Sequence, residues 1–269
     1  MSVPAEQEHD HKQRVRAQFG AHAQGYVESV RHRTGPDLQR LVELAEPTPQ
    51  SIALDIATGG GHTALALSSA VGSVVASDLT PEMLNAAETF IRGQGVENVT
   101  FEIAEAEQLP FADASFDIVS CRIAPHHFVD PRAYVREVAR VLRPGGRFVM
   151  MDSTPVGDGE LDEFINRVEH WRDPTHVRSY TEAEWRSWME AAGLTVDHWE
   201  ANHRVFEFRD WAARAGMDPQ ERDRLEQYML NAPERVRSAY EITYNQDGSI
   251  STFLDNKFIL RARKPGKAS

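Results

Sequence analysis

Residues 51–78 read SIALDIATGGGHTALALSSAVGSVVASD, and this stretch decides the fold. It runs from an apolar segment through an acid, Asp55, into a turn of three glycines, and then through a helix-like segment to a second apolar segment that ends at Asp78. Glycines let the backbone pass close to a ligand, and an acid about 20 residues further on is well placed to bind ribose hydroxyls. The stretch therefore predicts a site for a nucleotide-like cofactor.

The glycine turn alone leaves the cofactor open. Gly59, Gly61 and Ala64, followed by Asp78, also match the fingerprint of dinucleotide-binding proteins. A tight connection with no ligand is a third reading of the same turn. Asp78 can equally serve as the N-cap of the helix that is expected to begin at Pro81.

Strand and helix patterns alternate from this stretch onward. Strands are expected at residues 52–56, 73–77, 99–103, 116–121 and 147–151, and helices at residues 61–71, 81–93 and 131–142. Such alternation argues for a parallel sheet with helices on both faces.

Helical patterns also flank this core. Before it, we expect a polar, frayed end of about 10 residues and helices at residues 15–30 and 36–45. After it, we expect helices at residues 161–171, 182–192, 208–215 and 219–230, an extended segment at residues 195–208, and a strand pair formed by residues 242–244 and 249–262.

Two further features separate the cofactor readings. Asp55 ends the first strand where a dinucleotide-binding strand usually stays apolar, and an acid there can hold an amino-bearing ligand. Beyond the third strand the chain reads AEAEQLPFADASFDIV and then REVARVLRPGGRFVMMD. Over residues 52–152 these elements resemble, in order and spacing, the class I S-adenosylmethionine-dependent methyltransferases, the type that includes the ubiquinone/menaquinone C-methyltransferases. The segments FGAHAQGYVES, CRIAPHHF and RDPTHVR resemble a narrower group of bacterial methyltransferases of largely unassigned substrate.

The resemblance implies an α/β fold with a Rossmann-like, seven-stranded, mostly parallel sheet. It implies an N-terminal helical lid (residues 1–48), a cofactor-binding core (residues 49–153), and a remainder (residues 154–269) that completes the sheet and carries a helical substrate cap. The implied cofactor is S-adenosyl-L-methionine, whose methyl group passes to an oxygen, nitrogen or carbon of a small-molecule acceptor.

The resemblance also carries over individual cofactor residues. It implies that Asp55 organises the loop beside the methionine amino group and that Asp78 binds both ribose hydroxyls. Ala57 stands where the family has its first glycine, and Glu105 stands where the family often has an acid that bonds the adenine amino group. A plain solvated loop acid is the alternative for Glu105. The expected cofactor-binding residues are Tyr26, Asp55, Ala57, Gly59, Gly61, Asp78, Leu79, Met83, Glu105, Ala106 and Arg122.

His126 and His127 are the candidate catalytic residues. They follow the fourth strand, at the edge of the sheet where open α/β folds bind ligands, and histidine titrates near neutral pH. Each can act as a general base or orient a substrate, and the alternative is that they pack and bond to the backbone. Arg172 and His176 are candidates for binding an acidic or carbonyl-bearing substrate group, or else belong to an ion-paired helix end. We expect no metal, because no third ligand lies near the two histidines in sequence.

Composition limits the classes of partner. The chain has 269 residues, with 29 Lys and Arg against 41 Asp and Glu, and a net charge of -12 that repels a polyphosphate backbone. We therefore expect no nucleic-acid partner. The single cysteine, Cys121, excludes an intrachain disulfide. No apolar run approaches the ~18 residues of a membrane span, so we expect a cytoplasmic protein without stable membrane insertion. The sequence is compatible with a homodimer and does not decide the oligomeric state.

Two other classes of function stay open at this point. A nicotinamide-dependent (NAD) oxidoreductase of Rossmann type is supported by the glycine fingerprint and opposed by Asp55. A non-catalytic binding or scaffold protein with a degenerate turn is supported only by Ala57.

Overall fold

The computed structural model describes residues 5–28, 35–157 and 159–266. Its strands are β1 (Ile52–Ile56), β2 (Ser73–Asp78), β3 (Val99–Ile103), β4 (Phe116–Arg122), β5 (Leu142–Ser153), β6 (Thr195–Glu207) and β7 (Thr252–Arg263). Its helices are α1 (Ala5–Glu28), α3 (Pro36–Ala45), α4 (His62–Ser68), α5 (Pro81–Gly93), the short 3-10 helix η1 (Pro125–His127), α6 (Pro131–Val141), α7 (Gly159–Arg172), α8 (Glu182–Ala191), α9 (Phe208–Arg214), α10 (Pro219–Leu230) and α11 (Glu234–Ala239).

The strands form one sheet of seven in the order β3-β2-β1-β4-β5-β7-β6. The first five strands are parallel, and β7 runs antiparallel to both β5 and β6. This confirms the predicted seven-stranded, mostly parallel sheet. Parallel strands end at a common edge, so the residues that follow β1, β2 and β4 lie beside one another there.

Two hydrophobic clusters cover the two faces of this sheet. Helix α6 shows why its sequence buries one face. Tyr134, Val135 and Val138 recur at helical spacing and are fully buried, and each contributes about 1.5–3 kcal/mol by leaving water. Asp130 caps the helix by accepting hydrogen bonds from the amides of Arg132 and Ala133, as its position in the sequence predicts.

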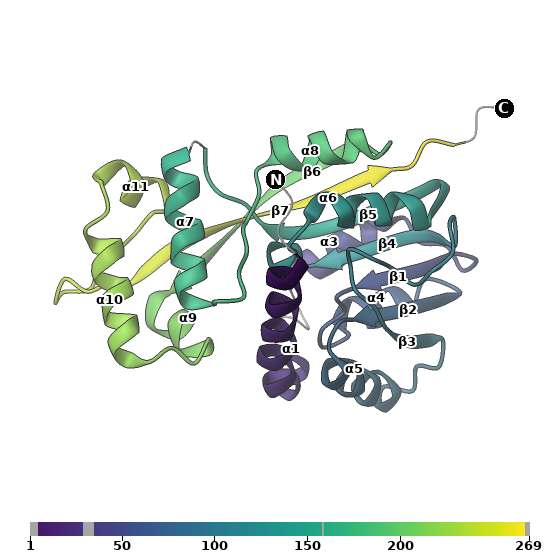
Figure 1. The fold of residues 1–269 in the computed structure, drawn as a ribbon, viewed down its shortest axis with the longest axis horizontal. Helices are drawn as coiled ribbons and strands as arrows, with labels where there is room; N and C mark the ends of the chain where they lie inside the picture. Colours follow the sequence, from purple (N-terminus) through teal and green to yellow (C-terminus); the bar gives the residue numbers. More distant parts are fainter. Residues whose placement is uncertain (1–4, 29–34, 158, 267–269) are drawn as a thin grey trace.

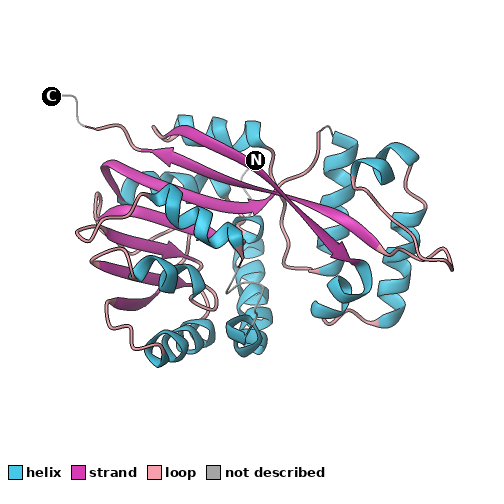
Figure 2. Ribbon diagram, turned by 180° about the vertical axis from the view of Figure 1, so that it is seen from behind, coloured by secondary structure: helices cyan, strands magenta, loops and turns pink. Residues whose placement is uncertain are grey.

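The strands β6 and β7 extend beyond the rest of the sheet. Strand β5 pairs with β7 only over residues 257–263, and the rest of β7 pairs with β6 alone as a two-stranded ribbon. Figures 1 and 2 show this ribbon leading into a second part of the molecule, built around α7, α9, α10 and α11. That part has its own hydrophobic cluster, which includes Phe164, Trp211, Tyr240 and Phe253.

Helix α1 lies between these two parts, beside the edge at which the parallel strands end (Figure 1). The sequence predicted a frayed end and a helix from residue 15, but the helix begins at Ala5. Good helix formers fill this extra length, with Glu6 and Glu8 in the first turn and a Glu8–Lys12 ion pair one turn apart. Residues 29 and 30 of the expected helix lie outside the described residues.

The chain end also differs in part from expectation. Residues 243–245 bond across the predicted turn to residues 249–252, with a bridge between Tyr244 and Ile250, but this pairing is short, whereas β7 pairs along most of its length with β6 and β5. Most residues of β7 are buried. The strand is therefore stabilised by its pairing with β5 and β6 more than by residues 242–244, which precede it in the chain.

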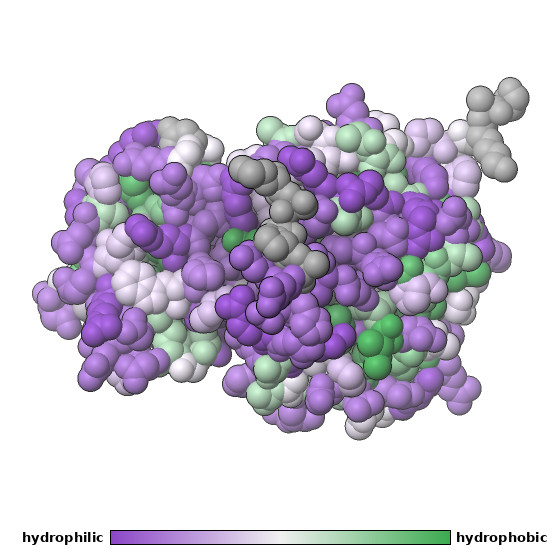
Figure 3. Space-filling view, viewed as in Figure 1, coloured by the Kyte–Doolittle hydropathy of each residue, from purple (hydrophilic) through white to green (hydrophobic). Residues whose placement is uncertain are grey.

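Hydrophilic side chains cover most of the face seen in Figure 3, over both parts of the molecule. None of the helices that the structure describes is both long and apolar enough to cross a membrane.

Candidate active site

The glycine turn connects β1 to α4 with an unusual backbone. Gly59 and Gly61 have φ angles of 53° and 80°, in the left-handed region that favours glycine. A Cβ on Gly61 would lie 2.9 Å from the Cδ1 atom of Ile91, so α5 packs directly against the turn. Ala57 also has a positive φ, 52°, which explains why a glycine suits this position.

Asp78 is bonded to the same turn. Its carboxylate accepts hydrogen bonds from the amides of Gly59 (3.0 Å) and Thr80 (2.9 Å), and the side chain is nearly buried. Burial raises the pKa of this carboxyl group, against the effect of the two amides. The N-cap of α5 is Thr80, so Asp78 does not take the helix-capping role that the sequence left open.

Asp55 lies one strand away and is held more tightly. The hydroxyls of Thr58 and Ser120 each donate a hydrogen bond of 2.7 Å to its two carboxylate oxygens. Only 1% of Asp55 is exposed, and burial raises its pKa to about 6. The acid therefore ties the glycine turn to β4, the strand that leads to the two histidines.

Four more of the expected cofactor-binding residues, those that follow β2 and β3, lie at the same edge. Met83 is buried, and its Cε atom lies 3.6 Å from the position that a Cβ on Gly59 would take. Ala106 is buried and Leu79 is half-buried. Glu105 is neither free nor fully solvated, because the Lys12 ammonium of α1 binds its carboxylate.

Helix α1 closes over this edge along its length. The guanidinium of Arg16 donates to the carbonyl of Leu79 (3.2 Å), and the imidazole of His62 donates to the carbonyl of Tyr26 (3.1 Å). A Cβ on Gly60 would lie 3.0 Å from the carbonyl carbon and oxygen of Tyr26, so the turn and the helix backbone are in direct contact. Tyr26, one of the expected cofactor-binding residues, lies at this contact, where burial raises the pKa of its phenol to about 12.

Arg122 extends from the end of β4 toward α3. Its guanidinium donates from Nε and Nη2 to the same oxygen, Oδ2, of the Asp37 carboxylate, and both side chains are buried, with exposures of 5% and 4%. The residue thus lies at the expected edge and links it to α3. The next residue, Ile123, has a φ of 58°, a strained conformation for a branched side chain.

The two histidines of η1 have different partners. The Nδ1 atom of His126 lies 2.6 Å from Oδ1 of Asp152, at the end of β5, and the Nδ1 atom of His127 donates to the carbonyl of Thr175 (2.9 Å). Burial and the neighbouring His126 lower the pKa of His127 to about 4. His126 therefore has a carboxylate as the partner of its Nδ1 atom, whereas His127 has a neutral backbone carbonyl.

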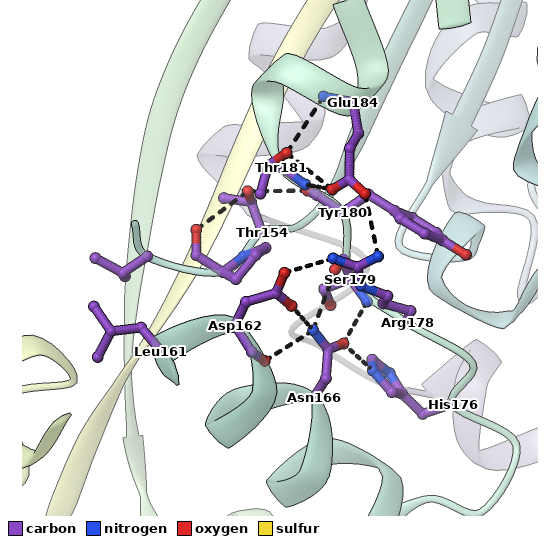
Figure 4. Close-up of polar contacts among 12 residues, drawn as sticks. Thr154, Leu161, Asp162, Asn166, His176, Arg178, Ser179, Tyr180, Thr181 and Glu184 are labelled. Atoms are coloured by element: carbon purple, nitrogen blue, oxygen red, sulfur yellow. Dashed lines mark hydrogen bonds and ion pairs between the residues drawn. The ribbon is translucent and has the colours of Figure 1, made fainter. Parts of the chain in front are cut away.

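Arg172 ends α7, in the second part of the molecule, and His176 lies in the segment that follows this helix. The Nε2 atom of His176 lies 2.9 Å from Oδ1 of Asn166, inside the network of Figure 4, and burial lowers the pKa of this histidine. Arg172 donates to the carbonyl of Trp211 (3.2 Å) and lies over its ring. Both side chains are held by α7 and α9 neighbours, and their expected role in substrate binding stays a prediction.

Residues that the sequence analysis did not single out complete the site. Lys12 binds the loop after β3, Asp152 binds His126, and Gln18 of α1 donates a hydrogen bond to Asp173, in the RDPTHVR segment (2.8 Å). The sequence contains a feature that could have indicated Asp152: like Asp55 and Asp78, it is an acid near the end of a parallel strand. Among the described residues, no group of His, Cys, Asp and Glu side chains is arranged to hold a metal ion.

Comparison with known proteins decides the class of enzyme. Residues 54–150 match the family described as "Methyltransferase domain". The uncharacterized methyltransferase YcgJ of Bacillus subtilis (strain 168) is 37% identical over 246 residues, which cover 91% of this chain and 97% of that protein. The chain belongs to the methyltransferase family.

Two further similarities agree with this methyltransferase assignment. The ubiquinone/menaquinone biosynthesis C-methyltransferase UbiE of Shewanella frigidimarina is 37% identical over 119 residues, or 42% of this chain and 47% of that protein. The solved structure of BH2331 from Bacillus halodurans C-125, also assigned to the methyltransferases, has a TM-score of 0.84 at 36% identity and covers 86% of this chain and 100% of that one. The protein is a class I methyltransferase, and nothing in these similarities supports the oxidoreductase alternative.

Proposed function

We propose that this methyltransferase uses S-adenosyl-L-methionine and transfers the methyl group to a small-molecule acceptor. The observation that carries the proposal is the convergence of Asp78 and Asp55 on one glycine turn, with the Glu105 loop bonded to Asp78 through the Ala104 amide and to α1 through Lys12. When bound, the cofactor supplies an electrophilic methyl group on a sulfonium.

The donor set fits this cofactor. A carboxylate has about four acceptor positions, and Asp78 uses two of them for the amides of Gly59 and Thr80. The remaining positions suit the two hydroxyls of a ribose. Each carboxylate oxygen of Asp55 accepts one hydrogen bond from a hydroxyl group and keeps a further acceptor position. The negative charge of Asp55 suits a nearby amino group.

The small-molecule acceptor is proposed from the shape of the site. Helix α1 and the residue 173–178 segment, which bonds to His126 and His127, are joined by the Gln18–Asp173 hydrogen bond, so a substrate bound at this edge of the sheet would be covered by both. Enclosure favours methyl transfer because it removes water from the nucleophile and holds it in line with the methyl group. On the same basis we propose three segments: a lid (residues 1–48), a cofactor-binding core (residues 49–153) and a remainder that carries the substrate cap (residues 154–269). A cytoplasmic location and a homodimer stay predictions of the sequence.

Calorimetry tests the cofactor. We expect S-adenosylhomocysteine to bind and NADH not to bind. The reverse result would refute the proposal. A screen of small-molecule acceptors, read by release of S-adenosylhomocysteine and starting with quinones and phenols, then tests the acceptor class.

A further inference from the structure

His126 and Asp152 form a pair whose geometry sets the state of the imidazole. Asp152 is only 1% exposed, and its Oδ1 atom lies 2.6 Å from Nδ1 of His126. A carboxylate accepts and does not donate, so Nδ1 carries the proton of the neutral imidazole. The lone pair is then on Nε2, the nitrogen that faces away from Asp152.

The backbone of His126 is fixed from the opposite side. Its carbonyl accepts hydrogen bonds from the amides of Val177 (2.8 Å) and Arg178 (3.1 Å), in the segment that follows α7. The His126 side chain keeps 14% of its surface exposed, although it lies between the two parts of the molecule. The ring is therefore immobilised by both parts and still reachable.

The charges around the ring come from several elements. Asp152 belongs to β5, Glu169 to α7 and Lys257 to β7, and all three act on His126. The imidazoles of His127 and His176 lie 4.1 and 5.4 Å from its ring. Burial lowers the pKa of both neighbouring histidines, so they stay neutral and do not compete for the proton.

We propose that Asp152 is a positioning residue that holds His126 as the general base of methyl transfer, and that the acceptor presents a weakly acidic hydroxyl, a phenol or an enol. This rests on the methyl transfer proposed above. An imidazole is a base of moderate strength, so it is matched to a hydroxyl that is more acidic than an alcohol. An acceptor without a proton on its nucleophilic atom has no use for such a base.

Nε2 of His126 takes the proton of the acceptor hydroxyl, while an oxygen lone pair forms the new bond to the methyl carbon. The bond between that carbon and sulfur breaks, and its electron pair stays on sulfur, which yields S-adenosylhomocysteine. The His126 imidazolium, stabilised by the Asp152 carboxylate, then releases its proton to water.

The first test measures the imidazole in the ligand-free protein. Burial lowers the pKa of His126, but the charge and hydrogen bond of Asp152 outweigh this effect, so the pKa lies above its ordinary value. In Asp152→Asn we expect the pKa of His126, read by nitrogen-15 and proton NMR and assigned with His126→Gln, to fall. An unchanged or higher pKa would overturn the pairing.

A measurement on the wild-type protein covers the case in which that variant does not fold. The nitrogen-15 shifts of neutral His126 should show the proton on Nδ1. A proton on Nε2 would overturn the assignment, because that nitrogen would then have no lone pair for the acceptor.

The second test uses 4-nitrophenol as the acceptor probe, with S-adenosylhomocysteine bound so that no turnover occurs. We expect the wild-type complex to bind the phenol and shift its ionisation to lower pH, as read by the visible absorbance of the phenolate. His126→Gln should bind S-adenosylhomocysteine within about twofold of wild type and lose the shift. No binding, or an equal shift in both proteins, would refute the acceptor class. Failure of wild type to bind S-adenosylhomocysteine would instead refute the proposed cofactor and leave the NMR result standing.

Discussion

The carboxylate of Asp78 accepts a hydrogen bond of 3.0 Å from the amide of Gly59, so the end of β2 and the turn after β1 form one unit. Through the same side chain, the amide of Thr80 fixes the start of α5. The acid is therefore oriented by two backbone amides before any ligand arrives.

Substitution of Asp78 tests this unit. Two charge-assisted hydrogen bonds to a ribose are each worth about 1.5–3 kcal/mol, so Asp78→Ala should raise the Kd of S-adenosylhomocysteine about 100-fold or more. Isothermal calorimetry measures the change. Asp223→Asn, an exposed acid on α10, is the matched control and should leave the Kd unchanged. A Kd within threefold of wild type for Asp78→Ala would contradict a role for this acid in cofactor binding.

Asp55 predicts a pH dependence of stability. Its pKa is about 6 in the folded protein, raised by burial, against about 3.9 in an unfolded chain. The folded state therefore binds more protons than the unfolded state between these values, so the contribution of Asp55 to stability is largest below about pH 4 and falls by about 3 kcal/mol as pH rises through 6.

Urea unfolding of wild type and Asp55→Asn at several pH values isolates this contribution. The free energy of unfolding of wild type, minus that of the variant, should fall between pH 4 and pH 7. A difference that stays flat, or one that rises with pH, would show that the folded protein does not hold Asp55 in its protonated form.

The Lys12 ammonium should hold α1 closed. It binds Glu105 and lies 3.6 Å from the Glu107 carboxylate, and a partly buried pair of this kind is worth about 1 kcal/mol. In Lys12→Met we expect S-adenosylhomocysteine to dissociate about fivefold faster, and chymotrypsin to cleave α1 sooner. Arg14→Met, at an exposed position of the same helix, is the control. Equal dissociation rates in the two variants would argue against a closing role for Lys12.

Gly60 tests the contact between the turn and α1. A Cβ there would meet the Tyr26 backbone at 3.0 Å, and neither backbone can move away cheaply. Gly60→Ala should loosen α1 and raise hydrogen exchange of its amides. Gly93→Ala, where a Cβ meets nothing within 4 Å, should leave this exchange unchanged. Protection of α1 that is the same in Gly60→Ala and wild type would mean that the helix does not rest on the turn.

Ala57 holds a strained backbone that a glycine relieves. Its φ of 52° costs an alanine about 1 kcal/mol, so Ala57→Gly should raise the free energy of unfolding by about that amount in urea titrations. Ala66→Gly, inside α4, should change it by a similar amount in the opposite direction. If both variants lose stability, Ala57 is not strained.

Sequence spacing predicted the sheet because each strand and helix there is a local pattern. The apolar runs, the glycine turn and the acids at strand ends all follow from the chain within a few dozen residues. It did not predict the length of α1, because charged residues carry no apolar periodicity, and it did not predict that β7 would pair with β6 along its whole length, beyond the short pairing across the turn.

The sequence by itself therefore determined the class of fold, and it singled out Asp55 and Asp78 as site candidates. These two acids lie in the same short stretch of chain as the glycine turn. Only the tertiary structure decided which histidine has a carboxylate partner and what holds α1 in place. His126 and Asp152 are 26 residues apart in sequence, and Lys12 and Glu105 are 93 residues apart. These pairs meet because parallel strands end at a common edge and α1 lies beside that edge, and no local pattern in the chain records which side chains meet there.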